Sequence, residues 1–243
     1  MAPIVILHTA DLHNRLSPAA ARQLADLKRE RSASLLLDAG DAVAAGNLTF
    51  RLRGEPILRL MARIGYNAMA MGNRESHPTR RLLERKLRDA AFPVLAANLL
   101  PERRPLPPIV RDHALFDGPA GTRLAVIGLA PQITSPRSAW ARLTDYVFDD
   151  PLPVARKLAG ELRQKADLVI CLSHCGEEID LQLAAIPEVD LVLGGHKHRN
   201  FVAHEPGRAL LVHPGHHGSH VACTELSSRD KAHSVLVPLE VGA

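Results

Sequence analysis

Residues 191–198 have the sequence Leu-Val-Leu-Gly-Gly-His-Lys-His, in which an apolar run is followed by two glycines and two histidines. The apolar run predicts a buried strand, and the glycines permit a tight turn directly after it. Because His196 and His198 are two positions apart, an extended loop lets both rings turn toward one point. Such a pair is equally typical of polar packing, so other parts of the chain must decide whether it binds metal.

Four further predicted strands also end in polar side chains. These strands are expected at residues 4–8, 34–37, 68–71 and 168–172, and the side chains that follow them are Asp11 and His13, Asp41, Asn73, and His174, respectively. Ligands in α/β folds lie beyond the carboxyl ends of the strands, so these groups should meet at one edge. Their oxygen and nitrogen atoms suit two divalent ions such as Mn, Fe, Ni or Zn, with the carboxylate of Asp41 between them.

Helical patterns alternate with these strands, and the chain ends in strands. Helices are predicted to start near Pro18, Pro56 and Pro78 and to span residues 152–165 and 177–185. Further strands are expected at 92–97, at 109–116 and 123–129 as a hairpin, and at 209–212, 220–226 and 234–239. Residues 131–150 show no period and are expected to form a lid or a surface loop. The order predicts an α/β sandwich with a mixed sheet or two sheets.

Composition narrows the class of protein. With 243 residues, of which 46% are hydrophobic and 23% charged, the chain is long enough for one globular domain, and it has no apolar run near the roughly 20 residues of a membrane span. The net charge is +4, but the arginines are spread along the sequence and aromatic residues make up only 3%, which argues against nucleic acid. Three cysteines and no secretion signal predict a cytoplasmic protein.

The ordered motifs resemble those of the calcineurin-like metallophosphoesterase superfamily. The matching motifs are Asp11-x-His13, Gly40-Asp41, Gly72-Asn73-Arg74-Glu75, His174, and Gly195-His196-x-His198. Within that superfamily, residues 9–14, 93–98 and 173–176 are most similar to the catalytic domain of 5′-nucleotidases. The resemblance runs from residue 4 to about residue 226, and it implies a four-layer α/β/β/α sandwich with mixed sheets, formed by residues 1–243 as a single catalytic domain.

The resemblance also implies a division of the ligands between two divalent ions. Asp11, His13 and His198 would hold the first ion. Asn73, His174 and His196 would hold the second, and Asp41 would be shared. A hydroxide between the ions would then attack phosphorus in line, because the ions lower its pKa and hold it in position.

Two departures from the 5′-nucleotidase pattern bear on the substrate. The 5′-nucleotidases have a catalytic histidine at the position of Arg74. UDP-2,3-diacylglucosamine hydrolases of the same superfamily resemble this chain in having arginine there, and they cleave a pyrophosphate. A guanidinium group holds phosphate oxygens but cannot give up a proton near neutrality. The alternative is that Arg74 only forms a salt bridge with Glu75 or a neighbouring acid. The chain also ends about where the catalytic domain does, so no C-terminal nucleotide-specificity domain is expected.

A histidine-rich turn follows the metal-binding motif. His213 and His220 are expected in strands and the turn between them in solvent, although His216 or His217 is a candidate for the proton donor missing at Arg74. Cys175 is interpreted as a small buried residue rather than a soft ligand or a reactive thiol. Lys197 either attracts an anionic substrate or points into solvent.

The sequence therefore predicts a dimetal phosphohydrolase that acts on a small phosphomonoester or nucleotide-like substrate. The alternatives are a phosphodiesterase or nucleotide-sugar pyrophosphatase, and a non-catalytic metal-binding module. No membrane partner is expected, nucleic acid is disfavoured, and the oligomeric state is left open.

Overall fold

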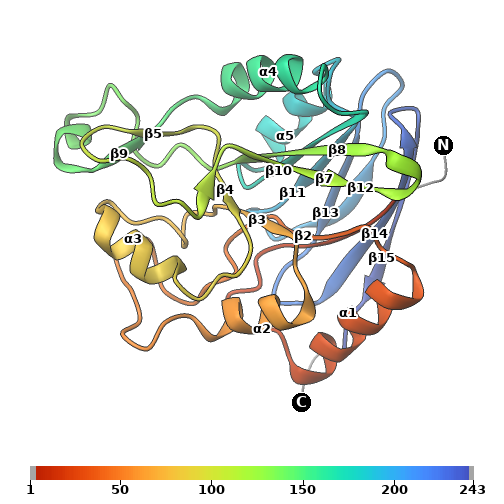
Figure 1. Cartoon of the computed structure of the whole chain (residues 1–243), viewed down its shortest axis with the longest axis horizontal. Helices are drawn as coiled ribbons and strands as arrows, with labels where there is room; N and C mark the ends of the chain where they lie inside the picture. The colour runs from red at the N-terminus through yellow and green to blue at the C-terminus, as the bar shows by residue number, and fades with distance from the viewer. Residues whose placement is uncertain (1–3, 241–243) are drawn as a thin grey trace.

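The computed structural model describes residues 4–240, which form two facing sheets and a small two-stranded sheet (Figure 1). The first sheet contains β1 (Ile4–Thr9), β2 (Leu35–Asp38), β3 (Ala68–Ala70), β4 (Val94–Leu95), β6 (Val110–Arg111), β14 (His220–Ser228) and β15 (Lys231–Pro238). The second contains β7 (His113–Asp117), β8 (Arg123–Leu129), β10 (Leu168–Ser173), β11 (Leu191–Gly194), β12 (Asn200–Ala203) and β13 (Leu210–Pro214). The small sheet pairs β5 (Leu99–Pro101) with β9 (Tyr146–Phe148).

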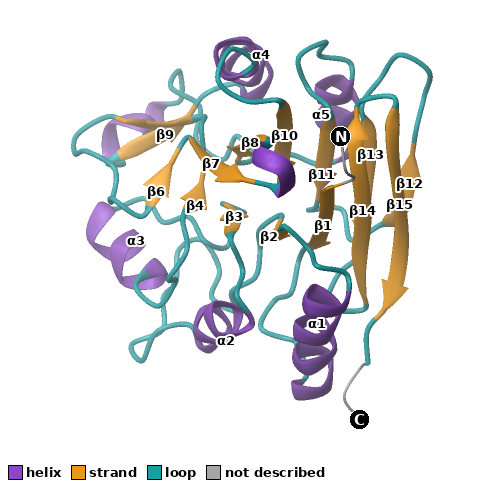
Figure 2. Ribbon diagram, turned by 45° about the vertical axis from the view of Figure 1, so that its right-hand side comes forward, coloured by secondary structure: helices purple, strands orange, loops and turns teal. Residues whose placement is uncertain are grey.

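Helices cover the outer face of each sheet (Figure 2). On one side lie α1 (Pro18–Glu30) and α2 (Pro56–Ile64), and on the other lie α4 (Pro151–Leu162) and α5 (Glu177–Ala184). A further helix, α3 (Arg80–Leu87), contributes Leu83 and Leu87 to the same apolar layer as α1 and α2, and a short 3-10 helix spans Ala139–Leu143. The four-layer α/β/β/α sandwich expected from the resemblance is confirmed.

Strand periodicity explains why three apolar layers form. Side chains alternate across a strand, so Ile6 of β1 enters the layer between the sheets while Leu7 packs against the helices. The inner layer also contains Ile170 and Leu193 from the second sheet, and the third layer joins that sheet to α4 and α5. Burial on both faces accounts for the near-continuous apolar runs of these strands.

Parallel pairing brings the predicted strand ends to one edge. In the first sheet β1, β2, β3 and β4 run parallel in this order, and in the second β8, β10, β11 and β13 do the same. The antiparallel strands β14 and β15 extend the first sheet, which makes it mixed as expected.

Several predicted boundaries are wrong, mainly where strands are short. The strand expected at 92–97 is only Val94–Leu95, and the helix expected from Pro78 begins at Arg80. The run 109–116 divides between the two sheets, so only β7 forms the hairpin with β8. Residues 131–150 contain β9, and β5 and β12 were not predicted, because edge strands of three or four residues carry too little periodic signal. Among residues 4–240, no helix combines the length and apolar character that a membrane span requires.

Candidate metal centre

The turns after five strands place the predicted ligands at the shared edge. Asp11 and His13 follow β1, Asp41 follows β2, Asn73 follows β3, His174 follows β10, and His196 and His198 follow β11. Five of these seven residues have left-handed backbone, with φ values of 53° (Asp11), 46° (His13), 54° (Asp41), 79° (His196) and 57° (His198). Such a conformation costs about 1–3 kcal/mol per residue and clusters at functional sites.

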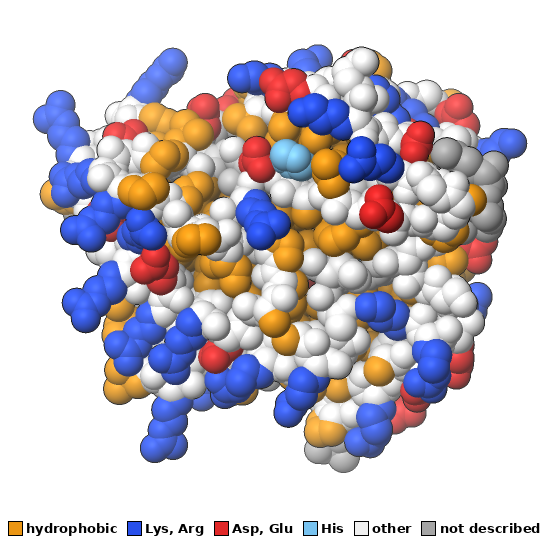
Figure 3. Space-filling view, in the orientation of Figure 1, with side chains coloured by type: hydrophobic (Ala, Val, Ile, Leu, Met, Phe, Trp, Pro, Cys, Tyr) orange, Lys and Arg blue, Asp and Glu red, His pale blue; other side chains and the backbone are white. Residues whose placement is uncertain are grey.

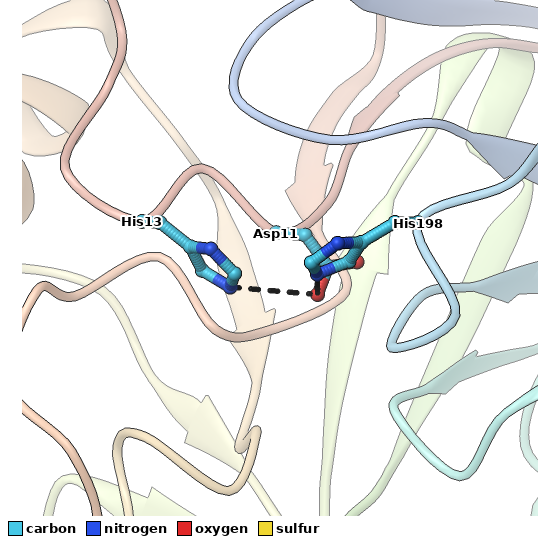
Figure 4. Close-up of side chains that lie close together, drawn as sticks. All are labelled: Asp11, His13 and His198. Atoms are coloured by element: carbon cyan, nitrogen blue, oxygen red, sulfur yellow. Dashed lines mark ion pairs between the residues drawn. The ribbon is translucent and has the colours of Figure 1, made fainter.

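Asp11 lies between two histidines on one side of the centre (Figure 4). Its Oδ1 is 3.8 Å from His13 Nε2 and 3.5 Å from His198 Nε2. Its Oδ2 accepts a hydrogen bond of 2.8 Å from the backbone N–H of His196, which ties the β1 loop to the β11 loop. These three side chains are the set predicted for the first ion.

Asp41 faces histidines on two sides. One carboxylate oxygen lies 3.6 Å from His13 Nε2, and the other lies 3.5 Å from His174 Nε2. The Nδ1–H of His174 donates to the Ala39 carbonyl at 2.7 Å, which leaves Nε2 free to act as a ligand. Ligand atoms of Asp11, Asp41 and His174 all lie within 4.8 Å of one another, and Asp11 also belongs to the group with His13 and His198. Both carboxylates therefore lie beside histidines of the two predicted sets.

His196 and Asn73 complete the predicted second set. The ring centroid of His196 lies 5.0 Å from that of His174, although His196 belongs to neither group of close ligand atoms found among residues 4–240. Asn73 Oδ1 is buried and has no hydrogen-bond partner.

Four buried polar atoms show that the centre fits metal ions. Asp11 Oδ1, His13 Nε2, Asn73 Oδ1 and His174 Nε2 are buried, and each lacks a hydrogen-bond partner. An unpaired buried polar atom costs about 1–3 kcal/mol, and a divalent cation would satisfy carboxylate, amide and imidazole atoms together.

The electrostatics of the centre favour positive charge. Burial lowers the pKa of His174, but Asp41, Asp11 and Glu75 outweigh this effect and raise it to about 9. Burial raises the pKa of Asp41, yet the rings of His13 and His174 and the backbone N–H of Arg74 hold it well below its usual value. A bound cation would supply the charge that these carboxylates favour.

Arg74 pairs with the predicted bridging carboxylate. Its backbone N–H donates to Asp41 Oδ1 at 2.7 Å, its Nε lies 3.6 Å from Asp41 Oδ2, and its Nη1 donates to the Ala44 carbonyl at 3.0 Å. Of the two salt bridges considered from the sequence, the one with a neighbouring acid is present. Glu75 instead accepts backbone N–H groups from Asp41 at 2.8 Å and Gly72 at 2.9 Å, and thereby fixes the loops that carry Asp41 and Asn73.

Lys86 is a structural residue of this edge that the sequence did not reveal. Its buried Nζ donates to the carbonyls of Gly46 at 2.8 Å, Arg74 at 2.7 Å and Ser76 at 3.0 Å. Burial lowers its pKa to about 8. A lysine in an arginine-rich helix is normally solvated, so the pattern gave no signal for this role.

The histidine-rich turn packs against the first group of ligands, which corrects the expectation of a solvated turn. His217 Nε2 lies 3.1 Å from His13 Nδ1, and its backbone N–H donates to the Asp11 carbonyl at 2.8 Å. The ring of His216 stacks on His198 with centroids 4.7 Å apart. The contacts of His217 join residues about 200 positions apart, which is why the turn alone did not predict them.

A row of buried polar side chains, which the sequence analysis did not identify, supports the loops that follow β10 and β11. The Ser173 hydroxyl donates to Asp180 Oδ1 at 2.5 Å and accepts the Cys175 backbone N–H at 3.1 Å. Asp180 Oδ2 lies 2.9 Å from His213 Nε2, and both residues are buried. Gly194 leaves room for this pair, because a Cβ there would overlap His213 Nε2 and lie 2.5 Å from Asp180 Oδ2.

Cys175 and Lys197 are next to predicted ligands in the sequence, and their surroundings decide between the interpretations given for them. Cys175 is partly buried, its Sγ donates to the Ala130 carbonyl at 3.3 Å, and burial raises the pKa of its thiol, which argues against a reactive thiolate. Lys197 is exposed, as one of its two interpretations required.

Comparison with known proteins agrees with this geometry. Residues 4–200 match the family model described as calcineurin-like phosphoesterase. The chain belongs to the calcineurin-like phosphoesterase family. This membership confirms the resemblance drawn from the motifs. Members of the family hydrolyse phosphoric esters, and the edge described above carries this chain's candidate metal ligands.

Curated relatives of this calcineurin-like phosphoesterase include 5′-nucleotidases. It is 31% identical to the UshA protein of Yersinia enterocolitica and 30% identical to a 5′-nucleotidase of Vibrio cholerae, in both cases over 79% of this chain and 40% of the relative. The structure of a 5′-nucleotidase precursor from Thermus thermophilus superposes with a TM-score of 0.81 at 25% identity, covering 98% of this chain and 54% of that one. The chain thus spans about two fifths of the length of these curated relatives.

Proposed function

We propose that this calcineurin-like phosphoesterase is a dimetal phosphohydrolase that cleaves a phosphomonoester or nucleotide-like substrate. The observation that carries the proposal is a set of four unpaired buried ligand atoms in the turns at one edge, of which His13 Nε2 and His174 Nε2 lie 3.6 and 3.5 Å from the two oxygens of Asp41. The 5′-nucleotidase relatives support the class of substrate.

We infer the division of ligands that the resemblance implies. Asp11, His13 and His198 would hold one ion, and Asn73, His174 and His196 the other, with Asp41 shared. When bound, a pair of divalent ions lowers the pKa of water and withdraws charge from phosphoryl oxygens. The chain itself orients the ligands: the Ala39 carbonyl fixes the tautomer of His174, and His217 fixes the ring of His13.

Arg74 determines which leaving groups the site favours. Its guanidinium group, beside Asp41, is placed to bind the oxygens of a substrate phosphate but cannot donate a proton near neutral pH. Leaving groups that need little protonation are therefore favoured, which keeps a phosphodiester or pyrophosphate substrate as the second candidate.

His216 and His217 remain candidates for the missing proton donor, and the structure favours a different role for His217. Burial and its neighbours His216 and Arg15 lower the pKa of His217 to about 4, so the ring is neutral at pH 7. With its Nε2 against His13, His217 is better placed to orient that ligand.

Metal analysis and hydrolysis assays test the proposal. We expect two divalent ions per chain and turnover of p-nitrophenyl phosphate, bis-p-nitrophenyl phosphate or nucleotides with added Mn, Ni, Co or Zn. Asp41→Asn should abolish turnover and reduce the metal content. Metal binding without turnover of any of these substrates would instead support a non-catalytic metal-binding module.

A further inference from the structure

Arginines that are scattered along the sequence gather on one face of the fold. Without the buried Lys86 and Glu75, four segments, 44–54, 74–90, 99–105 and 133–145, contain eleven arginine residues and only four acidic residues. Together they form the surface that we call the basic face, visible as the blue side chains at the left of Figure 3. Arginines that are spread along the sequence therefore lie together in the folded chain.

Contacts between the segments make the basic face one continuous surface. The guanidinium group of Arg85 lies over the ring of Phe50, 5.3 Å from its centroid, and Arg88 donates to the Leu52 carbonyl at 3.2 Å. The backbone N–H groups of Arg80 and Glu102 donate to the side chain and the carbonyl of Asp145, at 2.7 and 2.9 Å.

Much of the charge on the basic face is not neutralised. Arg51, Arg53, Arg103, Arg137 and Arg142 are exposed and have no ion pair within the described residues 4–240. A hollow of about 590 Å³ opens between α3 and the following loops, lined by Thr79, Arg81, Leu82, Arg85, Arg104 and Asp145.

The basic face also exposes apolar side chains. In the described part of the chain, the three most exposed large hydrophobic residues are Leu48 (70%), Leu52 (68%) and Leu143 (64%), and all three belong to it. Leu100 and Ile133, which are also exposed, lie on the same segments. Exposure of these leucines to water is energetically unfavourable, and exposed apolar side chains among arginines indicate a surface that binds a partner.

The basic face adjoins the candidate metal centre. Segment 44–54 follows the loop of Asp41, and segment 74–90 begins at Arg74, whose side chain contacts Asp41. A partner surface that binds the basic face would therefore place its charged groups near the candidate metal centre.

We propose that the basic face docks onto an anionic lipid membrane surface. Arginines would lie among the anionic headgroups, each strengthening binding about fivefold, while the leucines enter the boundary of the acyl chains. Nucleic acid would pair with the arginines but would leave the leucines in water, and the chain offers few aromatic rings for base stacking. An anionic bilayer satisfies both features. This inference does not rest on the proposed function, because docking requires neither metal nor turnover.

Sedimentation with lipid vesicles tests the docking. The intact chain is mixed with phosphatidylcholine vesicles that contain about one third phosphatidylglycerol, and with vesicles of phosphatidylcholine alone. We expect preferential pelleting with the anionic vesicles that weakens as salt is raised. No pelleting, or equal pelleting with both vesicles, overturns the proposal.

Paired variants assign the binding to the basic face. Leu48→Ser with Leu52→Ser, and separately Arg51→Gln with Arg53→Gln, should each weaken vesicle binding at least tenfold. The matched control, Val202→Ser with Arg22→Gln, changes exposed residues outside the basic face and should bind as the parent does. Unchanged thermal melting of each variant shows that it folds.

A nucleic-acid competitor separates the remaining possibility. A single-stranded RNA oligonucleotide is added to the vesicle assay at matched phosphate concentration. If the RNA binds more tightly than the anionic vesicles, and the leucine variant leaves both affinities unchanged, the basic face is a nucleic-acid surface and the membrane proposal is wrong.

Discussion

Substituting Gly194 by alanine tests whether the buried Asp180–His213 pair supports the metal centre. Gly194 is not among the residues with left-handed backbone, so the effect of a side chain there is steric. Its Cβ would overlap His213 Nε2 and lie 2.5 Å from Asp180 Oδ2, which forces the pair apart. Overpacking costs about 1–3 kcal/mol, and separating buried polar partners costs about 1–3 kcal/mol more. We therefore expect Gly194→Ala to lower the free energy of unfolding by about 2–6 kcal/mol.

Urea denaturation measures this loss, and a second glycine provides the control. Gly160 lies in α4, and an added Cβ would meet no atom within 4 Å. Gly160→Ala should stabilise the protein by about 0.5–1 kcal/mol, because alanine loses less backbone entropy in a helix. Metal titration of Gly194→Ala should also show weakened binding at the His174 and His196 site, since Gly194 directly precedes the His196 loop. A stability within about 0.5 kcal/mol of the parent, together with unchanged metal binding, would refute the supporting role.

Three further predictions concern the centre and its surroundings. Arg74→His should restore a proton donor and raise the ratio of alkyl-phosphate to p-nitrophenyl-phosphate hydrolysis by up to about 10²-fold, as measured by kcat/KM; an unchanged ratio would exclude leaving-group protonation at this position. His217→Ala should weaken metal affinity about 10-fold or more by freeing the ring of His13, as measured by isothermal titration, whereas a pure proton donor would change the pH–rate profile and leave affinity intact. Burial lowers the pKa of His8 from 6.5 to about 3, so the unfolded state binds the proton first and stability is lost as pH falls from 6.5 toward 3. His8→Leu should therefore lose about 2 kcal/mol less than the parent between pH 7 and pH 5 in urea denaturation, and equal losses would contradict the buried neutral imidazole.

The candidate site was predicted from the sequence because its signals are local. Each predicted ligand directly follows an apolar run of strand length, as His174 follows Leu168–Ser173, and parallel strands bring their carboxyl ends to one edge. The glycines beside His196 and Asp41 marked the same turns. Ligand atoms of five predicted residues therefore lie close together although the sequence gave no distance between them: Asp11, His13, Asp41, His174 and His198.

The supporting contacts could not be predicted in this way. His217 contacts His13 across 204 positions, and Lys86 reaches the loop of Gly46 across 40. Histidine in a turn and lysine on a helix are typical of solvated positions, so their residue types carried no signal for burial. The contact between Asp180 and His213 could not be predicted either, because only the fold places α5 against β13.

The sequence by itself determined an α/β sandwich and seven polar side chains in the turns after five of its strands, because hydrophobic periodicity and strand-end motifs are properties of neighbouring residues. The tertiary structure alone decided that Arg74 pairs with Asp41, that His217 holds His13, and that scattered arginines and leucines form one basic face. The physical reason is that burial and charge depend on which distant segments meet, and that meeting is fixed by sheet order and packing.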